Sequence, residues 1–160
     1  MGDPKKPRST YTTPRNPWGV DQLSRELMLV GTYGLRNKRE LWKVETELSR
    51  IRKQARRLLA APPETRTKQS SFLIDRLARL GLVGPTASID DVLSLKVEDL
   101  LERRLQTLVW RKGLAKSPYQ ARQLVSHRHV VISGNVVTKP NYLVARAEED
   151  AMTISGGGAA

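Results

Sequence analysis

The sequence predicts an α+β fold, in which a mainly helical platform precedes a small module of two helices packed on a short antiparallel sheet. Three observations lead to this prediction. An apolar stripe with helical spacing runs through residues 38–59, two short basic helices with recognisable caps follow within 97–128, and a valine-rich hairpin comes next. We divide the chain into an extended basic arm (1–20), a helical platform (21–100), a module (101–155) and a flexible tail (156–160).

Composition limits the class of protein. The chain has 160 residues, a net charge of +12 and no cysteine, so disulfides, thiolate zinc sites and cysteine nucleophiles are excluded. No apolar run approaches the roughly 20 residues of a membrane span, and the N-terminus lacks the apolar core of a signal peptide. We therefore expect a cytosolic protein whose excess positive charge is neutralised by a partner.

The arm and the first helix come before the platform's main helix. Residues 1–20 hold four prolines and a net charge of +3 without periodicity, which indicates either a flexible terminus or an arm that orders on a polyanion. Leu23, Leu27 and Val30 then predict a short helix that ends at Gly31.

The clearest helix covers 38–59. Asn37 is a candidate N-cap, and Glu40 three residues later completes the pattern of a capping box, while Pro62 and Pro63 end the helix. The arc opposite its apolar stripe carries five cations: Arg39, Lys43, Arg50, Lys53 and Arg57. A solvated polar face is the ordinary explanation. Because acids are sparse on this arc and a second basic block exists, we favour a nucleic-acid surface.

The rest of the platform is neutral and apolar. Residues 72–82 predict a helix that ends at Gly81, and Ser88 caps a short helix with Asp91 at its third position. Packing explains both helices better than binding does.

The module begins with a helix predicted from Val97 to Lys112, which buries leucines and Val109 and ends at Gly113. Ser117 caps the second helix, Pro118 takes its first position and Gln120 its third. This helix buries its apolar positions and turns four polar side chains outward: Arg122, Gln123, His127 and Arg128. Two strands follow, at 130–132 and 136–138, joined by a turn in which Gly134 and Asn135 take positive φ.

Charge is concentrated in this module. Residues 101–139 hold eight Lys and Arg against one acid, a local net of +7. The N–H groups at the start of the second helix lie beside Lys116 and favour a phosphate. A rigid helix pair with Arg and Lys suits the recognition of RNA shape, and counterion release predicts binding that weakens steeply with salt.

Longer motifs carry a resemblance to a family. ERRLQTLVWRKGLAKSPYQARQLVSHRHV, followed by the hairpin, resembles the S-four RNA-binding fold. TPRNPW near the start, YGLRNKRELWKVETELSRIRKQARRLL at 33–59 and VLSLKVEDLLERRLQTLVW at 92–110 resemble the universal small-subunit ribosomal protein four family, in its archaeal and eukaryotic form. The resemblance covers about residues 12–150, and the short C-terminus SGGGAA favours an archaeal source.

The resemblance implies a structural protein that binds the 5′ domain of small-subunit rRNA early in assembly, beside neighbouring ribosomal proteins. It also implies a place near the channel through which mRNA enters, and a part in decoding accuracy. The family's RNA-facing positions fall on Arg103, Arg104, Lys116, Ser117, Gln120, Arg122, Gln123, His127, Arg128 and His129. To these we add Lys139 and the five cations of 38–59, as the second half of a two-lobed RNA clamp whose platform helix continues into the module.

Metal binding, catalysis and base stacking by tryptophan have little support in the sequence. His127 and His129 have no accompanying cluster with ligand spacing, so we expect no metal and no catalysis, and His129 could simply begin a strand. Trp42 and Trp110 lie inside helical patterns and are predicted to pack rather than to stack on bases. We predict no cofactor, no small-molecule substrate and no membrane partner.

Two alternatives stay open, an RNA-modifying or tRNA-handling enzyme that uses the module as its RNA anchor, and a free-standing RNA chaperone. The chain is short for an additional catalytic domain, and the match at 33–59 argues against the chaperone. The clamp hypothesis predicts that charge reversal of Arg104 and Arg122 weakens RNA binding and leaves the fold intact.

Overall fold

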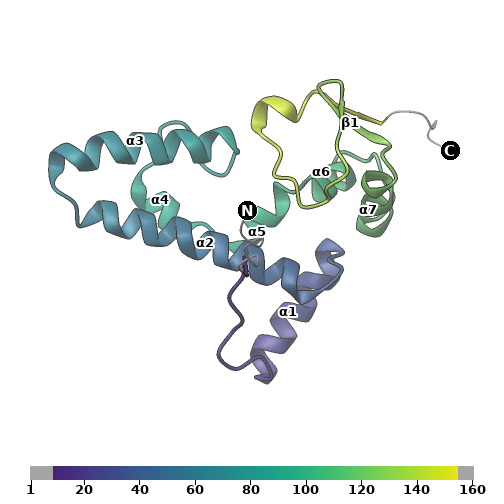
Figure 1. Ribbon diagram of the computed structural model, residues 1–160, viewed down its shortest axis with the longest axis horizontal. Coiled ribbons are helices and arrows are strands. Elements are labelled where there is room, and N and C mark those ends of the chain that lie inside the picture. Colours follow the sequence, from purple (N-terminus) through teal and green to yellow (C-terminus); the bar gives the residue numbers. More distant parts are fainter. Residues whose placement is uncertain (1–8, 155–160) are drawn as a thin grey trace, which may run out of the picture.

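A 22-residue helix, α2 (Lys38–Leu59), is the axis of the N-terminal lobe in the computed structural model, which describes residues 9–154 (Figure 1). The other elements of this lobe are α1 (Val20–Tyr33), α3 (Pro63–Arg79), α4 (Ile89–Ser94) and α5 (Val97–Glu102). The C-terminal lobe contains α6 (Leu105–Arg111), α7 (Pro118–Ser126), β1 (Val130–Ile132), β2 (Asn135–Val136), the 3-10 turn η1 (Arg146–Glu148) and β3 (Met152–Ile154). The predicted α+β class is confirmed. The first eight residues of the predicted arm and the predicted tail 156–160 lie outside the described residues.

Helix α2 forms as its sequence predicts. The Asn37 side chain accepts a hydrogen bond from the Glu40 backbone N–H at 3.2 Å, which satisfies one of the free donors of the first turn. The apolar stripe of α2 packs against α3 and α4, in a core that includes Leu48, Leu73 and Val92. Only one of the two hydrogen bonds of the predicted capping box forms. The Glu40 side chain does not bond back to the Asn37 N–H, because it turns into the molecule and accepts from Arg104 and Arg122.

Two helix ends differ from prediction. Helix α1 continues through Gly31 and ends at Gly34, whose φ of 59° is left-handed, and this extension brings Tyr33 into the core. Helix α3 begins at Pro63, much earlier than the predicted residue 72, since a proline fits the first helical position. The Ser88 cap, with its reciprocal bond to Asp91, is confirmed.

The predicted continuous helix from Val97 to Lys112 is wrong. The chain is helical to Glu102 and again from Leu105, but Arg104 between them is extended, with ψ of 142°. The break places this backbone against a C-terminal loop: the Leu105 N–H donates to the Tyr142 carbonyl at 2.8 Å, and Arg104 pairs with Leu143 in an isolated bridge. Tertiary pairing therefore overrides the helical periodicity of this segment.

The sheet has the antiparallel order β2-β1-β3. Its two-residue turn has positive φ at Ser133 (48°) and Gly134 (81°), so the prediction of Gly134 with Asn135 is one residue late. Two consecutive residues with positive φ match the twist of a tight hairpin. Asn135 consequently begins β2, and the predicted strand 136–138 is displaced. The strand β3 was not predicted.

Part of the N-terminal segment contacts α2. The Thr12 N–H donates to Thr46 Oγ1 at 3.0 Å, and the rings of Tyr11 and Trp42 have centroids 5.9 Å apart. Among the helices of residues 9–154, none combines the length and apolar character needed to cross a membrane.

Candidate nucleic-acid interface

The solvent-facing arc of α2 carries the first group of predicted contacts. All five of its predicted cations are exposed, and within residues 9–154 none of them forms an ion pair: Arg39, Lys43, Arg50, Lys53 and Arg57. They are exposed because the stripe on the other side of the helix, which includes Leu41 and Leu48, is buried. This surface, the α2 cationic face, can neutralise phosphates without breaking internal contacts.

A second exposed group surrounds α7, and we name it the α7 face. It consists of Lys116, Gln120, Gln123, His127, Arg128 and Lys139. Ser117 caps the helix by accepting from the Gln120 N–H at 3.2 Å, and the Gln120 side-chain oxygen accepts from the Lys116 N–H at 2.7 Å. These bonds leave the Gln120 amide donors and the Lys116 ammonium directed to solvent, where an anion can bind.

His129 lies at the edge of the α7 face. It is only partly exposed, and its backbone N–H bonds to the Leu124 carbonyl at 3.0 Å, immediately before β1. The alternative that His129 begins the strand is one residue early, because β1 starts at Val130.

Three predicted arginines form hydrogen bonds and ion pairs within the molecule, and one of them is buried. Arg104 is only 2% exposed, and its guanidinium donates to Glu40 at 2.7 Å and to the Asn141 side chain. Its prediction as an RNA-facing residue is wrong, because folding places a buried carboxylate from α2 beside it. Arg103, which is partly exposed, donates to Glu149 at 2.7 Å and to a backbone carbonyl at 3.0 Å.

Arg122 shares the same carboxylate. Its guanidinium donates to the two Glu40 oxygens at 2.7 and 3.2 Å and to Gln106 at 3.2 Å, and 23% of its side chain remains exposed. The expectation that reversal of Arg104 and Arg122 leaves the fold intact is therefore also wrong. Two new carboxylates would be buried against Glu40.

We call Glu40, Arg104, Arg122 and Gln106 the inter-lobe node. Glu40 belongs to α2, whereas the other three belong to the C-terminal lobe. The Gln106 amide donates to the carbonyls of Tyr33, Gly34 and Pro118 at 3.0 to 3.2 Å, so it also joins the end of α1 to the start of α7. The node fixes the position of the α7 face relative to the α2 cationic face.

The charge of Glu40 depends on this arrangement. Burial acts to raise the pKa of its carboxyl, but hydrogen bonds and positive charge from Arg122 and Arg104 outweigh burial and hold the pKa below its ordinary value. Burial lowers the pKa of Arg104, which Glu40 opposes; the guanidinium still stays charged at neutral pH, because its ordinary pKa is so high.

Both tryptophans pack as predicted. Trp42 is partly buried and donates from Nε1 to Glu26 at 3.0 Å. Trp110 is partly buried against the core of the C-terminal lobe, with the Arg111 guanidinium 4.6 Å from its ring centroid.

Sequence reasoning missed Glu40 as the centre of the node and Arg76 as a neighbour of the α2 cationic face. The sequence pattern explains Glu40 by its capping position and predicts that the segment containing Arg76 packs in the core. For Glu40, the available signal is a glutamate on the predicted apolar side of a basic helix. For Arg76, no local signal exists in the sequence.

Comparison with known families assigns the class of protein. The description "Ribosomal protein S4/S9 N-terminal domain" matches residues 5–102, and "S4 domain" matches residues 103–150. These matches cover most of the chain, which therefore belongs to the ribosomal protein S4 family, and the predicted resemblance is confirmed.

Relatives with the name "Small ribosomal subunit protein uS4" are similar over almost the whole chain. One from Ignicoccus hospitalis is 56% identical over 150 residues, which cover 94% of this chain and 90% of the relative. Another from Hyperthermus butylicus is 55% identical over 150 residues, covering 94% and 85%. A third from Cenarchaeum symbiosum is 54% identical over 159 residues, covering 99% and 78%. The three relatives are archaeal, which agrees with the predicted form of the family.

Proposed function

We propose that this chain is a structural constituent of the small ribosomal subunit that binds small-subunit rRNA. The observation that carries the proposal is kinship with proteins named for that subunit, at 54–56% identity over 94–99% of the chain. By the family resemblance, the rRNA partner is the 5′ domain, and binding takes place early in assembly in the cytoplasm.

The geometry supports a clamp with two contact surfaces. The α2 cationic face and the α7 face lie on different lobes, and the inter-lobe node joins the lobes through the Glu40 carboxylate and the Gln106 amide. A rigid pair of cationic surfaces recognises the shape of folded RNA better than a flexible chain does, because less conformational entropy is lost on binding. Each phosphate neutralised releases counterions, so binding should weaken with salt.

The family resemblance supports a more specific location and role within the subunit. We infer a location near the channel through which mRNA enters, with a contribution to decoding accuracy and with neighbouring ribosomal proteins as partners. Exposed apolar side chains on and just before α1 support a protein neighbour: Trp18, Val20, Leu27 and Met28.

The relatives are ribosomal proteins and not enzymes, which disfavours an RNA-modifying or tRNA-handling function. The platform match at residues 5–102 disfavours a free-standing chaperone, which could operate with the module alone.

Co-sedimentation with small ribosomal subunits through a salt gradient tests the proposal. We expect the wild-type chain to remain with the subunit at moderate salt. The double variant Arg50→Glu/Arg57→Glu should be released at lower salt, because it reverses two charges of the α2 cationic face. Arg66→Glu/Lys68→Glu is the matched control, since both residues are exposed on the first turns of α3, outside the two faces. Equal release of both variants would mean that only net charge matters, and free wild-type protein in the gradient would contradict the proposed function.

A further inference from the structure

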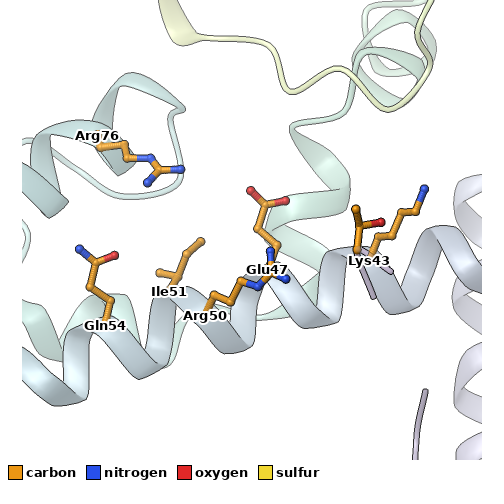
Figure 2. A pocket seen from close by; sticks show the side chains of 7 residues that line it. Lys43, Glu47, Arg50, Ile51, Gln54 and Arg76 are labelled. Atoms are coloured by element: carbon orange, nitrogen blue, oxygen red, sulfur yellow. The ribbon is translucent and has the colours of Figure 1, made fainter. Parts of the chain in front are cut away.

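A polar groove runs along α2 beside α3. Figure 2 shows its first part, a cleft of about 390 Å³ in which side chains from α2 face Arg76 of α3. This cleft is lined by Thr10, Lys43, Glu47, Arg50, Ile51, Gln54 and Arg76. A second cleft of about 510 Å³ shares Arg50 and Gln54 and continues along α2 to Lys53 and Arg57, with Gln69 of α3 on its other side. We call the two together the α2–α3 groove.

Packing of the apolar stripes creates the groove. Leu73 and Leu77 of α3 are buried against α2, and Arg76, adjacent to Leu77, is left exposed at the edge of this contact. The N-terminal segment reaches the same cleft through Thr10, and the bond from Thr12 to Thr46 fixes it on α2. The groove is therefore bounded by two helices and, at one end, by the arm.

The charges in the groove are unequal. Its lining contains five cations and a single acid, Glu47. Glu47 lies on α2 four residues after Lys43 and three before Arg50, and these two cations are roughly 10 Å apart along the axis at 1.5 Å per residue. Glu47 forms no ion pair within the part of the chain that the structure describes. In Figure 2 its carboxylate rises from α2 toward the space that Arg76 reaches from the other side.

The groove has room for one strand. A cleft of this volume is comparable to a small-molecule site and admits a nucleotide rather than the width of a duplex. The cations suit its phosphates, whose oxygens only accept hydrogen bonds. A carboxylate also only accepts, so a ligand that displaces water from Glu47 must offer it a donor to replace the lost hydrogen bonds. The sugar between two consecutive phosphates provides one in RNA, the 2′-hydroxyl, and provides none in DNA.

We propose that the α2–α3 groove binds one RNA strand and selects it against DNA. Lys43, Arg50 and Arg76 hold phosphates, and Glu47 accepts a hydrogen bond from the 2′-hydroxyl of a ribose between them. The inference rests on the proposed rRNA-binding function and assigns it a second, ribose-reading site away from the α7 face. A DNA strand in the groove places its phosphates near Glu47 without a compensating bond.

The test uses the full chain and single strands of about ten nucleotides, a length typical of single-strand sites. Fluorescence anisotropy compares RNA, the same sequence as DNA, and 2′-O-methyl RNA, which keeps the sugar and loses the donor. We expect the wild-type protein to favour RNA about tenfold over both analogues, the size expected for a hydrogen bond to a charged group. Glu47→Ala should bring this ratio close to one, mainly because binding of DNA improves.

Two further variants make the experiment specific. Arg76→Ala should weaken RNA and DNA equally, because Arg76 holds a phosphate. Glu64→Ala removes the same charge from an exposed position on α3 that does not line the groove, and it should leave the ratio unchanged. Circular dichroism of each variant should match the wild type, which separates binding effects from misfolding.

Several outcomes would overturn the inference. An unchanged ratio in Glu47→Ala would mean that the groove does not read ribose, and an unaffected Arg76→Ala would mean that the strand binds elsewhere. If replacing guanosine by inosine weakens RNA and DNA equally in the wild type but not in Glu47→Ala, Glu47 reads a base instead. All three results leave the proposed function standing, whereas failure of the wild-type protein to bind small-subunit rRNA at all would overturn the proposed function itself.

Discussion

Replacing Glu40 by glutamine is the perturbation that the structure predicts most sharply. The carboxylate accepts three hydrogen bonds from two guanidinium groups, at 2.7 Å from Arg104 and at 2.7 and 3.2 Å from Arg122. Only 10% of the Glu40 side chain and 2% of the Arg104 side chain are exposed. Glutamine keeps the size of the side chain and one acceptor oxygen but removes the charge, so Arg104 becomes a buried cation that has only neutral amide oxygens as partners, including that of Asn141.

The expected cost follows from this geometry. Removing one partner of a buried ion pair leaves an uncompensated charge and typically costs about 3–5 kcal/mol. Arg104 already has two nitrogens, Nε and Nη1, without a hydrogen-bond partner, so nothing else compensates it. With a fall of roughly 2–4 °C per kcal/mol for a domain of this size, Tm should decrease by about 10 °C.

Urea denaturation followed by circular dichroism measures the loss. The matched control is Asp150→Asn, which removes a carboxylate from an ion pair with Lys112 that has an N–O distance of 3.9 Å and a fully exposed aspartate. Exposed pairs contribute little, so the free energy of unfolding of this variant should stay close to wild type. A loss under about 1 kcal/mol for Glu40→Gln would show that solvent screens the node, and the reasoning would be refuted.

The remaining predictions concern pH, backbone and salt. The pKa of Glu40 is lower in the folded state than its ordinary value of 4.5. The ionised carboxylate therefore stabilises the fold above pH 4.5, and this stabilisation is lost as the pH falls through the folded-state pKa. In acid denaturation, the free energies of unfolding of the wild type and of Glu40→Gln should converge. Gly34→Ala should lower Tm more than Gly134→Ala does. Both glycines have positive φ, but a Cβ added at Gly34 lies 2.9 Å from Pro118, whereas a Cβ added at Gly134 has no neighbour within 4 Å. Asn37→Ala should cost about 1 kcal/mol in the same assay through loss of the cap; an unchanged Tm would contradict the cap's importance. Arg50→Glu should reduce the slope of log affinity against log salt by at least about one, and an unchanged slope would place Arg50 away from phosphates.

Local patterns in the sequence predict much of the fold because they describe local physics. Asn37, Ser88 and Ser117 are found as helix caps, since a cap depends on residues only three positions apart. The α2 cationic face is exposed as predicted because an apolar stripe on one side of a helix directs the other side to solvent. Family motifs over about residues 12–150 add the class of protein, which the family matches at 5–102 and 103–150 confirm.

Long-range pairing is where prediction failed. The break at Arg104 depends on Tyr142 and Leu143, almost 40 residues later, and no periodicity within 97–112 contains that information. The turn at Ser133 and Gly134 differs from prediction by one residue because the register of β1 with β2 decides which residues take positive φ.

The sequence by itself therefore determined the α+β class, the major helix α2, its caps and the two concentrations of positive charge, because each depends on neighbours within a few turns. Only the tertiary structure decided which cations are free to meet a polyanion. It placed Arg104 and Arg122 on the buried Glu40, 64 and 82 residues away, and brought Arg76 to the edge of the groove beside Arg50. The physical reason is that burial of a charge depends on what folds against it, and the partner can come from any part of the chain.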